Sequence, residues 1–378
     1  MEKKLRILQL VNIRWWNACA EYGINLAMGL HQRGHRVIVV GREGSPPLEK
    51  AQQLGVPVQA TRMESHRPGQ LLGSLRSLID LIRRENIEVI NAHRAEGHLF
   101  AALASSLLSR RTVVVVRTRG DVRPPKTHLL NRHLHRRLTD GLILTAEVLR
   151  GPVLQSLRKL PGEIAVIPPG IDLSRLTPVT SSGGNLRDLG LPEGNSVVGI
   201  VGRFSPVKGH ASFLEAARIV LRDQPGTIFL IVGHEAQIKT AQLKEQAERL
   251  GLADRLHFAG YVPDILPWID VLDIAVIAST GSEVICRVAL EHMAMAKPVV
   301  GTRINAIPEV VVHGSTGLLV PPEDPPAMAQ AILSLLRNPQ KARAFGMAGR
   351  KRVEQQFTLD HLAGRTETLY RQLLEEAS

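Results

Sequence analysis

Short runs of β-branched and aliphatic residues alternate with longer segments of helical periodicity along both halves of the chain. This alternation predicts βαβ units that build parallel sheets covered by helices on both faces. Strands are expected in the first half at 5–11, 36–40, 88–92, 113–116 and 142–145, and in the second at 197–201, 228–232, 256–258, 274–278, 298–301 and 318–320. Helices are expected between them, among others at 21–33, 209–222, 238–250, 287–296, 308–313 and 325–336.

Two breaks in this pattern divide the 378 residues. The low-complexity stretch 177–184 marks a junction between two domains. The last segment, 339–378, is helical and no strand follows it, so it is expected to bridge back across the domains. We predict domains over 1–176 and 185–356, with a returning C-terminal helix at 357–378. Doubly wound domains bind ligands at the carboxyl ends of their strands, here in a cleft between the two.

Charge separates the two halves. Residues 1–180 hold 27 Lys and Arg against 14 Asp and Glu, net +13, whereas residues 181–378 are nearly neutral. Nine basic residues and one acid, Asp121, fall within 110–137. This cluster favours an anionic partner, although a solvated basic face is the alternative. The 13 aromatic residues are too few for a single-strand nucleic-acid binder, which stacks bases on exposed rings.

The number of cysteines and the hydropathy pattern indicate the cellular compartment of the protein. The two cysteines cannot form a disulfide framework, which favours a reducing environment. The opening residues predict a strand rather than a signal peptide, and no apolar run is long enough to cross a bilayer. A cytoplasmic protein is expected, and any membrane contact would be peripheral.

A pair of cations follows the predicted strand 197–201. Arg203 and Lys208 lie in the turn that leads to a helix near Gly209. Cations beside the free N–H groups of a helix start suit a diphosphate. A structural turn with surface cations is the alternative. Neither a dinucleotide-binding nor a P-loop glycine motif occurs in the chain.

Two carboxylates follow the predicted strand 274–278. Glu283 is expected in the loop that enters a helix, and Glu291 about one turn into that helix. Carboxylates cannot neutralise the negative charge of a neighbouring diphosphate, but they accept hydrogen bonds from sugar hydroxyls. The alternative is helix capping by Glu283 and a solvent-facing Glu291.

Several motifs together resemble one family. In the second half these are Gly202-Arg203 with Lys208-Gly209, the Glu283/Glu291 pair, Lys297-Pro298-Val299-Val300, Pro308-Glu309-Val310-Val311 and 314–320. Weaker matches are 27–30, 33–37, 91–93 and 166–172, and 357–370 resembles a helix that crosses back between domains. The chain thus resembles the retaining glycosyltransferases of family 4 (group 1). Their GT-B fold implies two Rossmann-like α/β domains with doubly wound parallel sheets facing a cleft.

The resemblance implies roles for the motif residues. Arg203 and Lys208 would hold the donor diphosphate and stabilise the departing nucleotide without a metal. Glu283 would bind hydroxyls of the transferred sugar, and Glu291 the ribose diol. His93 resembles a residue that faces the cleft, with a satisfied buried histidine as the alternative. The remaining donor-binding positions would be Gly202, Val262 in the loop at the nucleobase, Val284, Ile285 and Cys286.

The chain departs from the family pattern at three places. Val284-Ile285-Cys286 stand where the family has glycines, which narrows the expected pocket. Trp15-Trp16 replace a glycine pair and either line an acceptor site or pack under their loop. Arg117-Thr118-Arg119-Gly120-Asp121 stand where the family has a histidine. Arg117, Arg119 and Asp121 are acceptor-side candidates; capping or an ion pair is the alternative for Asp121.

The resulting expectation is a retaining, metal-independent transfer from a UDP- or GDP-sugar, with no bound cofactor. In its front-face form, the leaving phosphate accepts the proton of the incoming hydroxyl. The basic half predicts an anionic or lipid-linked glycan acceptor, as in cell-envelope, lipopolysaccharide or glycolipid synthesis, and possible contact with an anionic membrane. A nucleotide-sugar 2-epimerase is the alternative, and a nucleic-acid partner is not expected.

Overall fold

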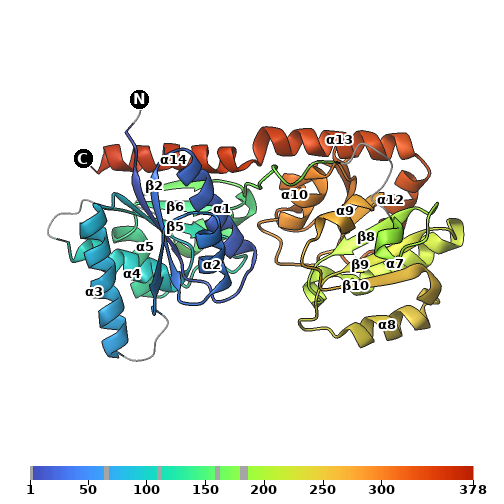
Figure 1. The fold of residues 1–378 in the computed structure, drawn as a ribbon, viewed down its shortest axis with the longest axis horizontal. Helices are drawn as coiled ribbons and strands as arrows, with labels where there is room; N and C mark the ends of the chain where they lie inside the picture. The colour runs from blue at the N-terminus through green and yellow to red at the C-terminus, as the bar shows by residue number, and fades with distance from the viewer. Residues whose placement is uncertain (1–2, 64–67, 109–112, 158–161, 179–185, 378) are drawn as a thin grey trace. The chain divides into compact units, whose positions relative to one another are not determined.

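The computed structural model describes residues 3–63, 68–108, 113–157, 162–178 and 186–377. The chain divides into two compact units, one made of Met1–Ile171 with Phe357–Ser378 and the other of Asp172–Gln356 (Figure 1). Each unit is built on a parallel sheet. The predicted fold class, two Rossmann-like α/β domains with a C-terminal helix that returns to the first, is confirmed. Most of the predicted junction 177–184 lies outside the described residues.

The first unit holds a seven-stranded sheet in the order β3-β2-β1-β4-β5-β6-β7. Its strands are β1 (Arg6–Val11), β2 (Arg36–Arg42), β3 (Val58–Thr61), β4 (Val89–Ala92), β5 (Val114–Arg119), β6 (Gly141–Leu144) and β7 (Glu163–Val166). The helices are α1 (Ala18–Gln32), α2 (Pro46–Gln53), α3 (Pro68–Glu85), α4 (Ala95–Ser106), α5 (Leu129–Arg137), η1 (Glu147–Leu149), α6 (Arg150–Leu157) and α14 (Leu359–Glu376). The strand order reverses between β1 and β4, and ligands of such sheets bind at this switch point.

The two edge strands of this sheet, β3 and β7, were not among the predicted strands. Both are four residues long and are only partly buried, whereas β4 and β6 are buried throughout. A half-exposed edge strand lacks the continuous apolar run that identifies a buried parallel strand. The prediction therefore found the centre of the sheet and missed its margins.

The second unit holds a six-stranded sheet in the order β10-β9-β8-β11-β12-β13. Its strands are β8 (Val197–Val201), β9 (Ile228–Val232), β10 (Leu256–Gly260), β11 (Ile274–Ile277), β12 (Val299–Thr302) and β13 (Gly317–Val320). The helices are η2 (Leu186–Leu189), η3 (Pro206–Lys208), α7 (His210–Asp223), α8 (Thr240–Arg249), η4 (Ala253–Arg255), α9 (Leu266–Asp270), α10 (Arg287–Ala294), α11 (Ile307–Val310), α12 (Pro325–Leu336) and α13 (Pro339–Gln356). Its switch point lies between β8 and β11.

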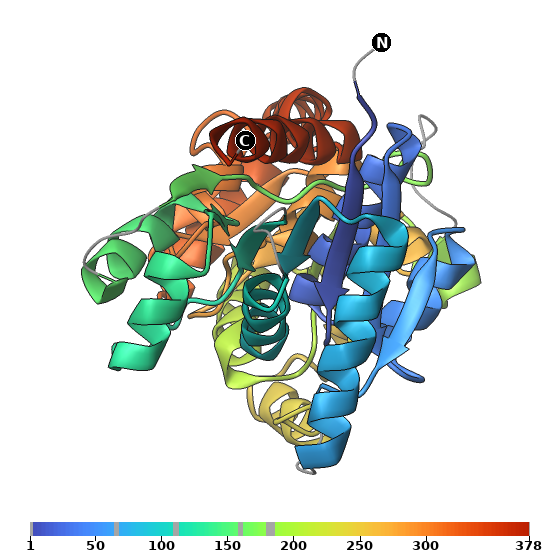
Figure 2. The ribbon, with the colours of Figure 1, turned by 90° about the vertical axis from the view of Figure 1, so that its left-hand side faces the viewer.

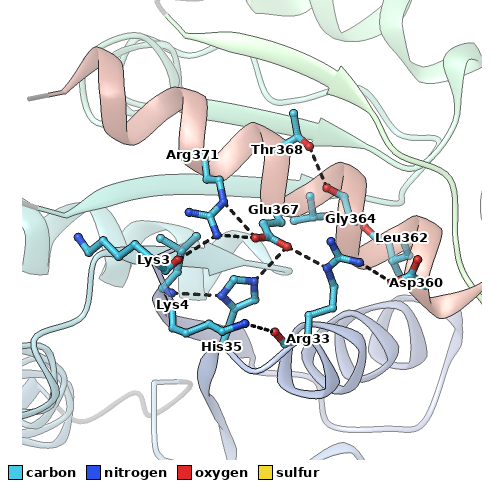
Figure 3. Close-up of polar contacts among 12 residues, drawn as sticks. Lys3, Lys4, Arg33, His35, Asp360, Leu362, Gly364, Glu367, Thr368 and Arg371 are labelled. Carbon is cyan, nitrogen blue, oxygen red and sulfur yellow. Dashed lines mark hydrogen bonds and ion pairs between the residues drawn. The ribbon is translucent and has the colours of Figure 1, made fainter. Parts of the chain in front are cut away.

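The C-terminal helix α14 packs along α1 of the first unit (Figure 1, Figure 2). The buried Tyr370 hydroxyl accepts hydrogen bonds from Gln9 at 3.2 Å and Asn91 at 2.8 Å. Near the start of β2, the Glu367 carboxylate lies 2.8 Å from Arg33 Nε and 3.1 Å from His35 Nε2 (Figure 3). A buried tyrosine and an ion-pair network therefore hold α14 against the sheet and against α1.

Candidate functional site

The turn after β8 places two cations at the start of α7. Arg203 is exposed, and no ion pair of its guanidinium occurs among the described residues. Lys208 ends η3, and Gly209 follows with φ of 69°, a left-handed conformation that favours glycine. A Cβ at Gly209 would lie 1.9 Å from the carbonyl oxygen of Ala278, so only glycine lets this turn approach the end of β11. The local sequence thereby brings Lys208 to the switch point.

Lys208 meets Glu283 at this point. Its ammonium group forms an ion pair with the Glu283 carboxylate, of which about one tenth is exposed. The Ser279 hydroxyl donates to the same carboxylate at 2.9 Å, and Thr302 donates to the Ser279 carbonyl oxygen at 2.5 Å. A cavity of about 10 Å³, room for one water molecule, lies beside these groups. The structure thus joins two predicted site residues and adds Ser279, which the sequence reasoning missed.

The carboxylate of Glu291 is buried on α10, so the alternative of a solvent-facing side chain is wrong. Its Oε1 accepts a hydrogen bond from Arg287 Nε at 2.9 Å. Its Oε2 is buried, and no hydrogen-bond donor for it occurs within the described ranges. An unsatisfied buried acceptor is costly, so a ligand that donates to Oε2 would relieve it.

The segment between the two glutamates is tightly packed. Val284, Ile285 and Cys286 are all buried. Cys286 rather than Glu283 precedes α10 at its start, and Glu283 provides no side-chain cap there, so the capping alternative is wrong. Cys286 has φ of 48°, a left-handed conformation that is strained for any residue but glycine. Burial raises the pKa of its thiol well above the ordinary value, and the Glu283 charge adds to this rise.

The predicted nucleobase loop follows β10. Gly260 ends this strand, and Val262 is half-buried beside the exposed ring of Tyr261. The Tyr261 ring contacts the His234 ring at a centroid distance of 6.3 Å. His234 comes after β9, so both rings lie at the carboxyl edge of the sheet that also carries Gly202. A flat ligand at this edge would find two aromatic side chains.

In the first unit, His93 follows β4 and is buried. Its Nε2 lies 2.8 Å from Gln9 Oε1, and Gln9 in turn donates to Tyr370. Burial, with a smaller contribution from the Arg117 charge, lowers the pKa of His93 to about 3. The imidazole is therefore neutral at physiological pH and partnered inside the unit, as the alternative of a satisfied buried histidine describes.

The basic cluster separates into inward and outward groups. Arg117 lies in β5 and is buried, and its Nη1 donates to the carbonyl oxygen of Ala92 at 2.8 Å. Burial, with the neighbouring Arg119 charge, lowers the pKa of Arg117 to about 9. No carboxylate forms an ion pair with Arg117 or Arg119 in the part of the chain that the structure describes. Arg110 and Arg111 of this cluster lie outside the described residues.

Asp121 does not point to a ligand. It pairs with Arg123 at 3.1 Å and accepts the backbone N–H of the same residue at 3.0 Å. Burial acts to raise the pKa of Asp121, but these bonds outweigh it and the pKa falls below the ordinary value. The local ion pair is the observed arrangement.

No group of three or more His, Cys, Asp or Glu side chains that could hold a metal ion occurs in the described ranges. None of the helices there is both long and apolar enough to cross a bilayer.

Two family models match the chain. The model described as Glycosyl transferases group 1 matches residues 195–338, and the one described as Glycosyltransferase Family 4 matches residues 20–175. A curated relative, D-inositol 3-phosphate glycosyltransferase of Segniliparus rotundus, is 31% identical over 61% of this chain and 52% of its own length. The chain thus spans about half to two thirds of the length of the first curated relatives it matches.

Solved structures share the fold over nearly the whole chain. A glycosyltransferase from Rickettsia africae superposes with a TM-score of 0.87 at 21% identity, covering 99% of this chain and 100% of that one. HepE from Anabaena, crystallised with UDP and glucose, superposes with a TM-score of 0.81 at 22% identity, covering 97% and 99%. At these identities the likeness speaks for the fold.

Proposed function

The chain belongs to the group 1 glycosyltransferases of family 4, and from this premise we propose that it transfers a sugar from a nucleotide sugar to an acceptor hydroxyl with retention at the anomeric carbon. The observation that carries the proposal is the meeting of Lys208 and Glu283 at the switch point between β8 and β11. The Lys208 ammonium group can bind a phosphate, and the Glu283 carboxylate can accept a hydrogen bond from a sugar hydroxyl. Both lie where doubly wound sheets bind their ligands.

The donor would occupy the carboxyl edge of the second unit. Its diphosphate would replace Glu283 as the partner of Lys208, and Arg203 offers a second cation without a competing carboxylate in the described residues. Glu283 would then accept from the transferred sugar, and the free Oε2 of Glu291 from a ribose hydroxyl. Gly202 would let the chain pass close to the phosphates, while Val262 lies at the base, and Val284, Ile285 and Cys286 wall the sugar pocket. The crystal of HepE with UDP and glucose supports a donor of this class.

The reaction we propose is a front-face substitution. The bond from the anomeric carbon to the phosphate oxygen breaks, and the acceptor oxygen forms its bond on the same face of the sugar. The acceptor proton passes to the leaving phosphate, whose remaining charge Arg203 and Lys208 stabilise. Because cations of the chain perform this role, chelation of divalent metals is expected to leave the rate unchanged.

The acceptor is expected to carry an anionic group. Arg117 is a buried cation and Arg119 a half-buried one at the end of β5, and neither has a paired carboxylate in the described residues. A buried cation is stabilised by an anion that shares its site. The name of the Segniliparus relative includes a phosphorylated polyol, which agrees with a phosphate-bearing acceptor. Acceptors of cell-envelope glycan, lipopolysaccharide and glycolipid synthesis fit this description, and the neutral His93 would act on this side only as a hydrogen-bonding group.

Thermal unfolding with nucleotide sugars tests the donor site. A bound donor raises the melting temperature by mass action, so a UDP- or GDP-sugar is expected to stabilise the wild type. Lys208→Ala and Glu291→Gln are expected to lose most of this shift and to lower kcat/KM for transfer by about 10²–10³. Lys244→Ala, an exposed lysine of α8, is the matched control. A full shift in Lys208→Ala, or no shift with any nucleotide sugar, would overturn the donor site.

The product decides the mechanism. Proton NMR of the new glycosidic bond is expected to report the anomeric configuration of the donor. An inverted product contradicts retention, and a glycosyl group trapped on Glu283 contradicts the front-face step. Conversion of the nucleotide sugar without any acceptor would make the chain a 2-epimerase.

A further inference from the structure

The first unit leaves five leucines uncovered on two neighbouring helices. Leu129 and Leu130 open α5 and are 81% and 80% exposed. Leu99 and Leu103 on α4 and Leu107 directly after it recur every four residues, and each is at least 39% exposed. The ring centroids of His98 and His135 lie 4.7 Å apart, so the first turn of α4 is in contact with the last turn of α5. We call these five residues the leucine face.

The leucine face is not explained by packing within its own unit. The side of α4 that contacts the sheet is already formed by buried residues, among them Ala101 and Ala104. Leucines four apart form a stripe along a helix, here on the side away from that buried surface. At the start of α5, five consecutive residues, 126–130, are exposed. Exposed large apolar side chains on the outer sides of two helices mark an interaction surface.

The surroundings of the leucine face are basic. Arg123, Lys126 and Arg137 are exposed around the start and end of α5. Between 113 and 137 the chain holds seven Lys and Arg residues and one acidic residue, Asp121, which is engaged by Arg123. Leucines bordered by lysine and arginine are the pattern of helices that lie in the interface of an anionic bilayer.

We propose that the outer surface of α4 and α5 docks on an anionic lipid bilayer, with the leucine face inserted among the acyl chains and Lys126 and Arg137 at the headgroups. A second copy of the chain fits this surface less well, because two identical basic faces would repel each other. The purpose of this docking rests on the proposed function: an acceptor held in a membrane would be met where α5 begins, ten residues after β5 ends beside the Arg117 site.

Vesicle sedimentation with the full chain tests this proposal without any reaction. The wild type is expected to pellet with vesicles of phosphatidylcholine and phosphatidylglycerol, and to stay in solution with phosphatidylcholine alone. The double variant Leu129→Ser/Leu130→Ser is expected to lower the partition coefficient at least about tenfold, because two side chains no longer insert. Lys126→Gln/Arg137→Gln is expected to weaken binding and its salt dependence together.

Controls separate docking from folding and from catalysis. Met347→Ser on α13 removes a side chain that is 60% exposed in the second unit, and it is expected to bind vesicles as the wild type does. Thermal unfolding and transfer to a water-soluble acceptor are expected to be the same in the leucine variant as in the wild type. A chain that binds vesicles but transfers no sugar would disprove the proposed function alone.

Three results would overturn the docking surface. The first is a wild type that does not sediment with anionic vesicles. The second is a leucine variant that sediments as strongly as the wild type. The third is a dimer in sedimentation equilibrium that the leucine substitutions convert to monomer, since the leucine face would then join two copies of the chain.

Discussion

The two units place charge at their switch points in opposite ways. In the second unit Lys208 and Glu283 neutralise each other, and Arg287 lies against Glu291. In the first unit Arg117 is buried and Arg119 is half-buried at the end of β5, and no ion pair with a carboxylate forms there among the described residues. Apart from the exposed Arg203, the edge of the second unit is thus balanced, whereas the edge of the first unit carries an excess of positive charge.

This difference indicates how each edge would receive its ligand. At the balanced edge a diphosphate has to compete with Glu283 for Lys208, so binding exchanges one ion pair for another and releases the carboxylate to the sugar. At the cationic edge an anion replaces nothing and relieves the cost of a buried, uncompensated charge. The balanced edge of the second unit favours discrimination between donors, whereas the cationic edge of the first unit favours attraction of any suitably placed anion.

Arg117→Met is the substitution with the largest expected effect on this comparison. Loss of a charge-assisted contact of about 2–3 kcal/mol is expected to lower kcat/KM for a phosphorylated acceptor about 100-fold. Donor-induced stabilisation is expected to be unchanged. The free energy of unfolding should stay the same or rise by about 1 kcal/mol, because a buried cation without an ion pair is removed. Steady-state kinetics and urea unfolding measure the two effects.

The exposed Arg123 provides the matched control. Arg123→Met removes an arginine six residues further along the chain and is expected to leave acceptor kinetics within about twofold of the wild type. The contrary result is strong destabilisation of the fold by Arg117→Met, with donor binding lowered as much as acceptor use. Arg117 would then be a structural residue whose role is the hydrogen bond to the Ala92 carbonyl oxygen.

The sequence could not separate these arginines. Counted along the chain, Arg117, Arg119 and Arg123 belong to one basic cluster, and a strand ending at residue 116 leaves all of them in a loop. The structure extends β5 to Arg119, and this extension is what buries Arg117. Net charge and spacing indicate that an anion is bound, but burial, which depends on the neighbouring strands, decides which cation can bind it.

The opposite edge of the first sheet shows that this unit balances charge where no ligand is expected. There the Glu367 carboxylate is buried among Arg33, His35 and Arg371 (Figure 3). Burial acts to raise the pKa of Glu367, but hydrogen bonds from Arg33 and Arg371 outweigh it and lower the pKa from 4.5 to about 2. The folded-state pKa is below the unfolded one, so this stabilisation is present above about pH 4.5 and is lost as the pH falls toward about 2.

Glu367→Gln is therefore expected to cost up to about 3 kcal/mol of unfolding free energy near neutral pH. The difference from the wild type should shrink as the pH is lowered below about 4.5, which urea unfolding at a series of pH values would show. Asp360→Asn is the control: this carboxylate also pairs with Arg33, but it is 75% exposed and its loss should matter little. A pH-independent cost of Glu367→Gln would mean that packing, and not charge, holds α14.

More of the donor edge in the second unit than of the acceptor edge in the first unit could be predicted from the sequence. The motifs located Lys208, Glu283 and Glu291 because residue type and spacing carry their chemistry, and the buried strands before them were predicted nearly to the residue. The Lys208–Glu283 pair and the Ser279 contact were not predicted, since they depend on how β8, β11 and β12 lie side by side. The sequence shows that the family's glycines are absent at 284–286, but it does not show the left-handed backbone conformation of Cys286.

This backbone conformation gives the smallest expected effect. Cys286 occupies a left-handed conformation, so the edge of the second unit carries backbone strain, whereas the edge of the first unit carries uncompensated positive charge. Both Cys286→Gly and Cys286→Ala remove a buried sulfur atom, but only glycine adopts this φ without strain. The glycine variant is therefore expected to be more stable than the alanine variant by about 1 kcal/mol, the reverse of their order inside a helix. Urea unfolding of the two variants measures this difference. If alanine proved the more stable, the left-handed turn before α10 would carry no strain, and the contrast between the two edges would rest on charge alone.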